Sequence, residues 1–437
     1  MFAIFMSSGL FLGWSLGAND ASNVFGTAVA SKMLRFKTAA IWCSAFLILG
    51  AVVSGAGATH TLGKLGAVNA IAGAFIVAFS AAASVYLMTK ARYPVSTSQA
   101  IVGAILGWNF FSGSPTDYGA LMKIVGTWVV CPVLSAVFAV FIYKAVVLFI
   151  KMFKPGIFRQ DLLTRYGLLV VGAFGSYSLG ANNIANVMGV FVPVSPFADI
   201  SLNGWIRLSA AQQLFFIGAI AIAVGVFTYS RRVMETVGAG IFKLSPVAAF
   251  VVVLSHAVVL FIFASQGLQH FMMRLGLPPI PLVPVSSSQA IVGAVIGVAL
   301  LKGGRGIRWR TLGGITSSWV ITPIIAAFVC FIALFLLQNV FEQEVYRPTI
   351  ASLHLKSNAP DQMEKATPFA AVPLALPAAQ TGHERKKTIK APAVGRIDKG
   401  RAGQGRLPEN RPQLGKLQKT FPSVILPHAA VAHAAEG

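Results

Sequence analysis

The sequence has 437 residues, of which 56% are hydrophobic and only 11% are charged, whereas charged residues make up about a quarter of a typical soluble domain. Several apolar runs exceed the ~20 residues that a helix needs to cross a bilayer. This composition excludes a soluble globular protein and predicts an all-α, multi-pass protein of the cell membrane. The net charge of +22 does not indicate nucleic-acid binding, because most Lys and Arg residues flank apolar runs, where they orient membrane proteins.

The apolar runs predict about ten membrane passages. The two shortest of them begin near residues 95 and 285, and each is either a full span or a re-entrant half-helix. The predicted passages are 2–30, 38–59, 66–89, 95–111, 120–150, 166–192, 208–229, 240–265, 285–301 and 311–338.

The first motif, Gly17-Ala-Asn-Asp-Ala-Ser-Asn23, lies inside an apolar run and is echoed at Gly180–Asn186. A carboxylate such as Asp20 at membrane depth costs about 2.5–3.5 kcal/mol even on the lenient insertion scale, so it is retained where it is paired, hydrated or bound to a cation. A satisfied core residue is the alternative, but the neighbouring amides and the duplication favour a site. Carboxylate and amide oxygens suit hard cations, and unwound backbone at the two glycines would add ligands. The predicted cation-coupling residues are Asn19, Asp20, Asn23, Asn182, Asn183 and Asn186, with a sodium site at Asp20, Asn23 and Asn186.

The second motif is Pro-Val followed by three hydroxyl residues and Gln, and it also occurs twice. Proline suits a first helical turn, so the hydroxyls would lie at helix N-termini, where free backbone N–H groups and the positive dipole end attract anions. Helix capping alone would need only one hydroxyl. The motif therefore predicts a pocket for a tetrahedral oxyanion, with the binding residues Ser96, Thr97, Ser98, Gln99, Ser286, Ser287, Ser288 and Gln289.

The two motifs occur in the same order twice, which indicates an internal repeat of about five passages. Ala100–Ala104 and Ala290–Ala294 are identical, and Trp128 and Trp319 precede Pro132 and Pro323 at equal spacing. An odd number of passages turns the second repeat upside down, and inverted repeats are typical of transporters with a solute site near the midplane. The predicted domains are residues 1–160, residues 161–345 and a tail at 346–437.

The basic residues predict the orientation. Sixteen Lys and Arg residues cluster at 31–37, 90–92, 151–165, 231–243 and 302–310, whereas the opposite loops hold five, namely Lys64, Lys123, Arg207, Arg274 and Arg347. The positive-inside rule places the richer face in the cytoplasm and both termini outside.

The segment from about residue 346 onward is rich in Pro, Lys, Arg, Gly and Gln and lacks helical or strand periodicity. Such a composition predicts a disordered basic tail. Binding to anionic lipid headgroups is the alternative to a solvated tail, and composition favours the solvated one.

The chain lacks the sequence marks of an enzyme. It contains no Gly-x-x-x-x-Gly-Lys-Ser/Thr loop for ATP, no His-Glu-x-x-His and no Gly-x-Ser-x-Gly. Cys43, Cys131 and Cys330 stand alone in apolar runs and predict neither a disulfide framework nor a metal site. A secondary transporter with no cofactor besides a coupled sodium ion or proton fits these features, and an anion channel is the alternative of a different class.

Together the four motifs resemble the inorganic phosphate transporter family, the phosphate permeases related to mammalian sodium–phosphate symporters. The resemblance covers about residues 1–340. It implies cation-coupled phosphate import by inverted repeats, with Asn19, Asp20 and Asn23 and then Asn182, Asn183 and Asn186 matching the two signatures, and Ser96–Gln99 and Ser286–Gln289 matching the anion-binding segments.

Two departures from the family pattern change the expected chemistry. Asn183 stands where the family usually has Asp, which removes one carboxylate, and Gln99 and Gln289 stand where many relatives have His. The family also contains sulfate permeases, so phosphate or sulfate, a monovalent cation and membrane lipid are the expected partners. A homo-oligomer remains an alternative to a single copy.

Overall fold

The computed structural model describes residues 2–66, 68–90, 95–202, 206–237, 244–304 and 307–347. The predicted tail therefore lies outside the described residues, apart from its first two positions. All described elements belong to one compact unit within Met1–Lys365.

The described elements of the first half of the chain are all helices. The helix α5 (Thr97–Ser112) begins and ends at capping residues: it starts after Ser96, whose Oγ accepts the Gln99 N–H, and stops before Gly113, whose φ of 66° suits glycine. The helices are α1 (Phe2–Ala30), α2 (Phe36–Ser54), α3 (Ala56–Leu65), α4 (Ile71–Lys90), α5 (Thr97–Ser112) and α6 (Tyr118–Phe153).

The second half is also helical except for one short hairpin. Its elements are α7 (Ile157–Met188), the 3-10 helix η1 (Gly189–Val194), β1 (Ile200–Leu202), β2 (Ile206–Leu208), α8 (Ala210–Thr228), α9 (Ser230–Val237), α10 (Pro246–Ala264), α11 (Gln266–Arg274), α12 (Ser287–Leu301) and α13 (Trp309–Asn339). The antiparallel pair β1–β2, with Ile200 opposite Leu208, departs from the all-α prediction.

Seven described helices are long and apolar enough to cross a membrane, namely α1, α2, α4, α6, α8, α10 and α13. Three further helices carry the remaining predicted passages. Of these, α5 and α12 are only about 24 and 22 Å long at 1.5 Å per residue, which is shorter than a hydrocarbon core of about 30 Å. The third, α7, has 32 residues and contains the second Asn motif.

The expected unwinding at the Asn motifs is wrong, because α1 and α7 run as continuous helices through Gly17 and Gly180. These glycines serve helix packing instead. A Cβ at Gly17 would lie 2.8 Å from the carbonyl carbon of Ile222, and one at Gly180 would lie 2.9 Å from that of Leu47. Breaks occur at other places, since α2 ends at Gly55 and α10 ends at Ser265.

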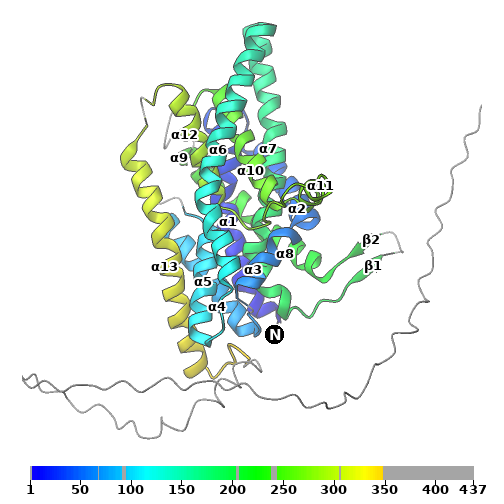
Figure 1. The fold of residues 1–437 in the computed structure, drawn as a ribbon, viewed down its shortest axis with the longest axis vertical. Helices are drawn as coiled ribbons and strands as arrows, with labels where there is room; N and C mark the ends of the chain where they lie inside the picture. Colours follow the sequence, from blue (N-terminus) through cyan, green and yellow to red (C-terminus); the bar gives the residue numbers. More distant parts are fainter. Residues whose placement is uncertain are drawn as a thin grey trace, which may run out of the picture. The chain divides into compact units, whose positions relative to one another are not determined.

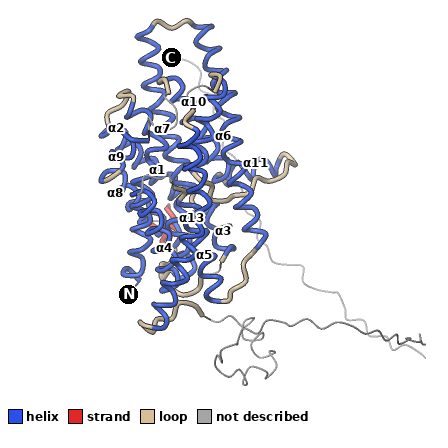
Figure 2. Tube along the Cα trace, turned by 90° about the vertical axis from the view of Figure 1, so that its left-hand side faces the viewer, coloured by secondary structure: helices blue, strands red, loops and turns tan. Residues whose placement is uncertain are grey.

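The two halves of the chain interlock around α1. This helix is covered by α4, α8 and α9, while α5 from the first half packs on α13 and α12 from the second half packs on α6. Figure 1 shows α13 beside α5 at one side of the bundle. The ends of α6 and α7 meet near residues 154–156 and project beyond the other helices, at the opposite end from the N-terminus (Figures 1 and 2).

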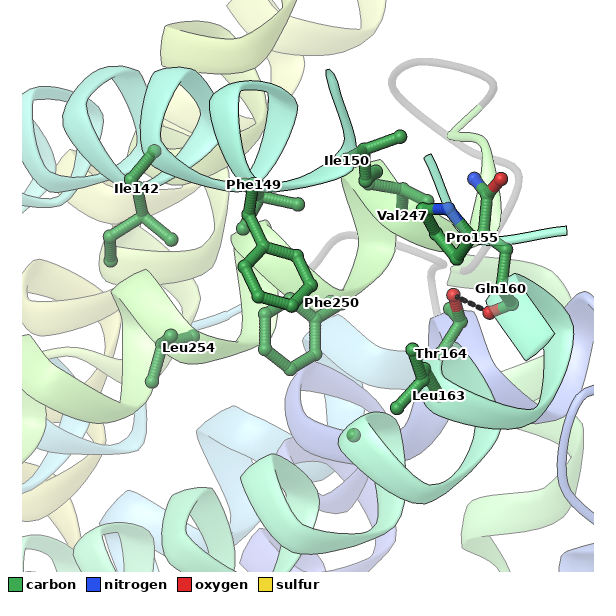
Figure 3. Close-up of a pocket in the computed structure, with 13 residues that line it drawn as sticks. Ile142, Phe149, Ile150, Pro155, Gln160, Leu163, Thr164, Val247, Phe250 and Leu254 are labelled. Atoms are coloured by element: carbon green, nitrogen blue, oxygen red, sulfur yellow. Dashed lines mark hydrogen bonds between the residues drawn. The ribbon is translucent and has the colours of Figure 1, made fainter. Parts of the chain in front are cut away.

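An apolar cavity of about 570 Å³ lies between α6, α7 and α10. Figure 3 shows Phe149 and Phe250 on its walls, and the Thr164 hydroxyl at its edge donates to the Gln160 carbonyl oxygen over 2.7 Å. This lining offers almost no hydrogen-bond donor to a solute, so the cavity is unsuited to an inorganic anion.

Candidate functional site

The two Asn motifs meet at a buried carboxylate. Asp20 of α1 is only 3% exposed. Its Oδ1 accepts an N–H from the Asn19 amide at 2.8 Å, and its Oδ2 accepts one from the Asn183 amide of α7 at 3.2 Å. Within the part of the chain that the structure describes, no Lys or Arg pairs with Asp20. The carboxylate is therefore hydrogen-bonded but is not neutralised by a basic side chain of this region.

The two hydroxyl motifs lie at the starts of α5 and α12, as predicted. Ser96 and Ser286 act as N-caps, because their Oγ atoms accept the N–H groups of Gln99 and Gln289 at 3.3 and 3.2 Å. Capping uses one hydroxyl of each motif. Buried atoms without a hydrogen-bond partner in the described region include Thr97 Oγ1 and the side-chain oxygens of both glutamines.

Hydrogen bonds run reciprocally between the two halves of the chain. Asn186 of α7 donates to Ser98 Oγ of the first hydroxyl motif over 2.8 Å. Asn23 of α1 donates to Ser287 Oγ of the second hydroxyl motif over 3.0 Å. Each Asn motif thus holds a hydroxyl from the opposite half, namely the third hydroxyl of the first motif and the second hydroxyl of the second motif.

Backbone groups complete the network. The Val285 N–H donates to Asn182 Oδ1 at 3.0 Å, and its carbonyl oxygen accepts from Ser98 Oγ at 3.0 Å. Asn19 reaches the carbonyl oxygen of Val95 at 3.4 Å. The chain entering each hydroxyl motif is therefore tied to an Asn motif.

The structure brings all fourteen predicted site residues into one buried region. All of them fall in the buried class. The three predicted sodium ligands do not contact one another by hydrogen bonds; Asn186 is linked to Asp20 through Asn183, whose Oδ1 accepts from Asn186 at 3.3 Å. The Oδ1 atom of Asn186 is buried and has no partner among the described residues, so it is an available oxygen near the carboxylate.

Sequence reasoning missed two residues of this region. His256 of α10 is fully buried, and its Nε2 lies 2.9 Å from Ser287 Oγ. Cys131 of α6 places its Sγ 3.7 Å from the Ser286 carbonyl oxygen. The signal for His256 was present, because it is an ionisable residue inside a long apolar run, the same criterion that identified Asp20.

The chemistry of the site is that of a donor-rich pocket beside one carboxylate. The N-termini of α5 and α12 present backbone N–H groups and positive dipole ends. The hydroxyls add neutral donors, which suit an oxyanion. Asp20 and the amide oxygens supply hard acceptors, which suit a cation.

Comparisons with known proteins show the family of the chain. A family model described as the phosphate transporter family matches residues 16–161, 157–270 and 281–421. A Methanocaldococcus jannaschii protein named "putative phosphate permease" is 30% identical over 318 residues, which is 72% of this chain and 91% of that protein. The chloroplastic inorganic phosphate transporter 2-1 of Arabidopsis thaliana is 23% identical over 74% of this chain and 70% of its own length.

A solved structure has the same fold. It is described as the sodium-dependent phosphate transporter, and it is similar with a TM-score of 0.61 and 22% identity over 77% of this chain and 98% of that one. The relatives and the fold are those of transporters and not of enzymes. The chain is a multi-pass membrane protein, and it belongs to the phosphate transporter family.

Proposed function

We propose that this protein imports inorganic phosphate by symport with sodium ions or protons. The observation that carries the proposal is the reciprocal pair of hydrogen bonds, Asn186 to Ser98 and Asn23 to Ser287. Because each bond joins a cation-type motif to an anion-type motif, occupancy of one kind of site changes the donors available at the other. Such a differential interaction is what coupling between two ligands requires.

The cation would bind on the Asp20 side of this network. Asp20, Asn23 and Asn186 are the proposed sodium ligands, with Asn183 between Asp20 and Asn186. A bound cation draws amide oxygens toward itself and so redirects the amide N–H groups that now hold the two serines. The anion would then be held by Ser96–Gln99 and Ser286–Gln289 at the two helix N-termini.

The transport cycle would be alternating access between two inverted repeats, residues 1–160 and 161–345, with ten passages in all. Equivalent packing in the two halves supports this proposal. A Cβ on Gly103 of α5 would lie 2.6 Å from Pro323 Cα of α13, and one on Gly293 of α12 would lie 2.6 Å from Pro132 Cα of α6. Two such matching environments would let the halves exchange conformations around a shared site.

Phosphate is preferred to sulfate because the family and its named relatives are phosphate transporters. The chemistry of the site adds an argument. Phosphate can carry a proton at neutral pH, and Asp20 is an acceptor at the site that could hold it. Sulfate, which carries no proton under these conditions, would place only acceptor oxygens beside this carboxylate.

The proposal is tested by uptake of labelled phosphate and labelled sulfate into proteoliposomes that contain the purified chain. Four conditions are compared: an inward sodium gradient, an inward proton gradient, both and neither. We expect phosphate to accumulate above its external concentration only when a cation gradient is imposed. Equilibration without accumulation under every gradient would indicate a channel. Accumulation of sulfate alone would show that sulfate, and not phosphate, is the substrate.

A further inference from the structure

His256 stands out as an ionisable side chain that the proposed transport cycle leaves unused. It lies in the middle of α10, a helix of apolar residues, and it is fully buried. Its ring has two nitrogen atoms. Nε2 is 2.9 Å from Ser287 Oγ, whereas Nδ1 is buried with no hydrogen-bond partner in the described region.

The unpartnered Nδ1 determines which nitrogen carries the proton. If the proton were on Nδ1, a buried N–H would lack an acceptor, and such orphaned donors are rare in proteins. With the proton on Nε2, the ring donates to Ser287 Oγ and leaves a lone pair unfilled on Nδ1. The donor without a partner is then the Ser287 hydroxyl, which, unlike a ring N–H, can rotate toward a ligand. The neutral ring therefore acts as a hydrogen-bond donor to Ser287.

The hydroxyl of Ser287 is then left with only one possible role. A serine oxygen has two lone pairs and one hydrogen. Asn23 fills one lone pair at 3.0 Å and His256 fills the other at 2.9 Å. The remaining O–H has no acceptor among the described residues, so it can serve as a donor to a ligand.

The serine of the first half that accepts from an Asn motif is used differently, although it lies one position later in its hydroxyl motif. Ser98 Oγ accepts from Asn186, as Ser287 accepts from Asn23, but it donates its hydrogen to the Val285 carbonyl oxygen at 3.0 Å. The hydrogen of the Ser98 hydroxyl is therefore already bonded within the protein. Of these two serines, Ser287 is the one whose hydrogen is free, and His256 faces it.

We propose that His256 is a positioning residue that holds the Ser287 hydroxyl as an obligate donor to the transported oxyanion. This inference rests on the proposed function, since it assumes that Ser287 binds the anion. A hydroxyl held in this way cannot accept a hydrogen bond from its ligand. It therefore selects an anion that turns an unprotonated oxygen toward α12, and the protonated oxygen of hydrogen phosphate would face elsewhere in the pocket.

Substitutions that place an amide nitrogen at different distances from Cβ separate a hydrogen-bonding role of His256 from a packing role. The amide nitrogen of glutamine is as many bonds from Cβ as His Nε2, whereas that of asparagine corresponds to Nδ1. We expect His256→Gln to keep phosphate binding within about threefold of wild type. His256→Asn and His256→Leu should weaken phosphate binding roughly tenfold, because the Ser287 hydroxyl would no longer be held as a donor to the charged ligand.

A double-mutant cycle tests whether His256 acts through Ser287. Purified variants His256→Leu, Ser287→Ala and their combination are titrated with labelled phosphate, and uptake gives KM and the maximal rate. We expect the double variant to bind phosphate no more weakly than Ser287→Ala, because without the serine hydroxyl His256 has no group to position. The weaker binding should raise KM more than it lowers the maximal rate of uptake. His270→Leu, on exposed α11, is the matched control and should leave both values unchanged.

The outcomes distinguish this inference from the proposed function. Wild-type protein that neither binds nor transports phosphate contradicts the function itself. Wild-type protein that transports phosphate, with equal affinities for the Gln, Asn and Leu variants or with additive losses in the double variant, overturns only the role of His256. If His256→Leu does not fold, the comparison of the Gln and Asn variants, which are both polar, still decides the question.

Discussion

Asn183 donates to Asp20 across the contact between α7 and α1 over 3.2 Å, so two related motifs meet as an amide on one side and a carboxylate on the other. A symmetric pair of carboxylates at this distance would repel unless a cation or a proton lay between them. The amide removes that requirement. The protein can therefore form this contact without a bound cation. This difference between Asp20 and Asn183 determines the effect expected from substituting each of them.

Asp20→Asn should abolish gradient-driven accumulation of phosphate. The substitution removes the only charge that the site offers to a cation and leaves the side-chain size unchanged. It also turns an amide toward two donor amides, so we expect a loss of about 1–3 kcal/mol in unfolding free energy. The measurement is uptake per folded molecule against sodium concentration and pH. Wild-type accumulation by this variant would mean that Asp20 is a structural residue.

Asn183→Asp should make transport more dependent on the cation. Two carboxylates would then face each other where one hydrogen bond now exists, and only a cation or a shared proton can hold them together. We expect uptake without sodium or a proton gradient to fall and the dependence of uptake on sodium concentration to become steeper. Asn183→Ala is the control, because it removes the hydrogen bond without adding charge. An unchanged sodium dependence in Asn183→Asp would contradict the contact between these two positions.

Much of this site could be predicted from the sequence because the membrane makes polar residues conspicuous. Asp20, the asparagines and the hydroxyl runs each interrupt an apolar segment, where burial without partners is costly. The duplication then indicated which segments belong together. The same reasoning predicted the helix starts at Ser96 and Ser286, since both caps form.

Other features could not be predicted, because they depend on the packing between segments. The sequence does not show whether Asn186 bonds to Ser98 or to a residue of its own half; in the structure it bonds to Ser98. It also misled at Gly17 and Gly180, which looked like helix breaks but allow α8 and α2 to approach closely. A glycine in an apolar run fits both interpretations until the neighbouring helix is known.

Ser96→Ala and Thr97→Val should differ in their effects on stability, and Thr97→Val should weaken phosphate binding. Ser96 caps α5, so its loss should cost about 1 kcal/mol of unfolding free energy. The Thr97 hydroxyl has no partner in the described region although it is buried. Thr97→Val should therefore leave stability unchanged or raise it, while weakening phosphate binding roughly tenfold if the hydroxyl donates to the anion. Thermal unfolding and phosphate titration of the two variants and of the wild type check both parts, and a wild-type phosphate affinity of Thr97→Val would remove Thr97 from the site.

The two ends of α6 should lie on opposite sides of the membrane. This helix has 36 residues and is about 54 Å long at 1.5 Å per residue. Tyr118 at its start is 73% exposed and Phe158, just beyond its end, is 92% exposed. With Cys43, Cys131 and Cys330 buried, an impermeant thiol reagent added to intact cells should label Tyr118→Cys and spare Phe158→Cys until the membrane is opened. Labelling of Phe158→Cys alone would reverse the predicted orientation.

Gly103→Ala and Gly293→Ala should each destabilise the protein and weaken phosphate binding. These glycines allow α5 and α12 to approach the backbone at Pro323 and Pro132. An added methyl group must push the helices apart, which costs typically about 1–3 kcal/mol.

The same displacement would move the N-termini of α5 and α12, which carry the hydroxyl motifs, away from their partners. Gly126→Ala in α6 and Gly313→Ala in α13 are the controls, since a Cβ at either position meets no atom within 4 Å. These two should gain about 0.5–1 kcal/mol, because alanine favours a helix over glycine. Thermal unfolding of the four variants measures the contrast. A gain in stability for Gly103→Ala and Gly293→Ala as well would show that neither helix pair is packed as closely as the structure has it.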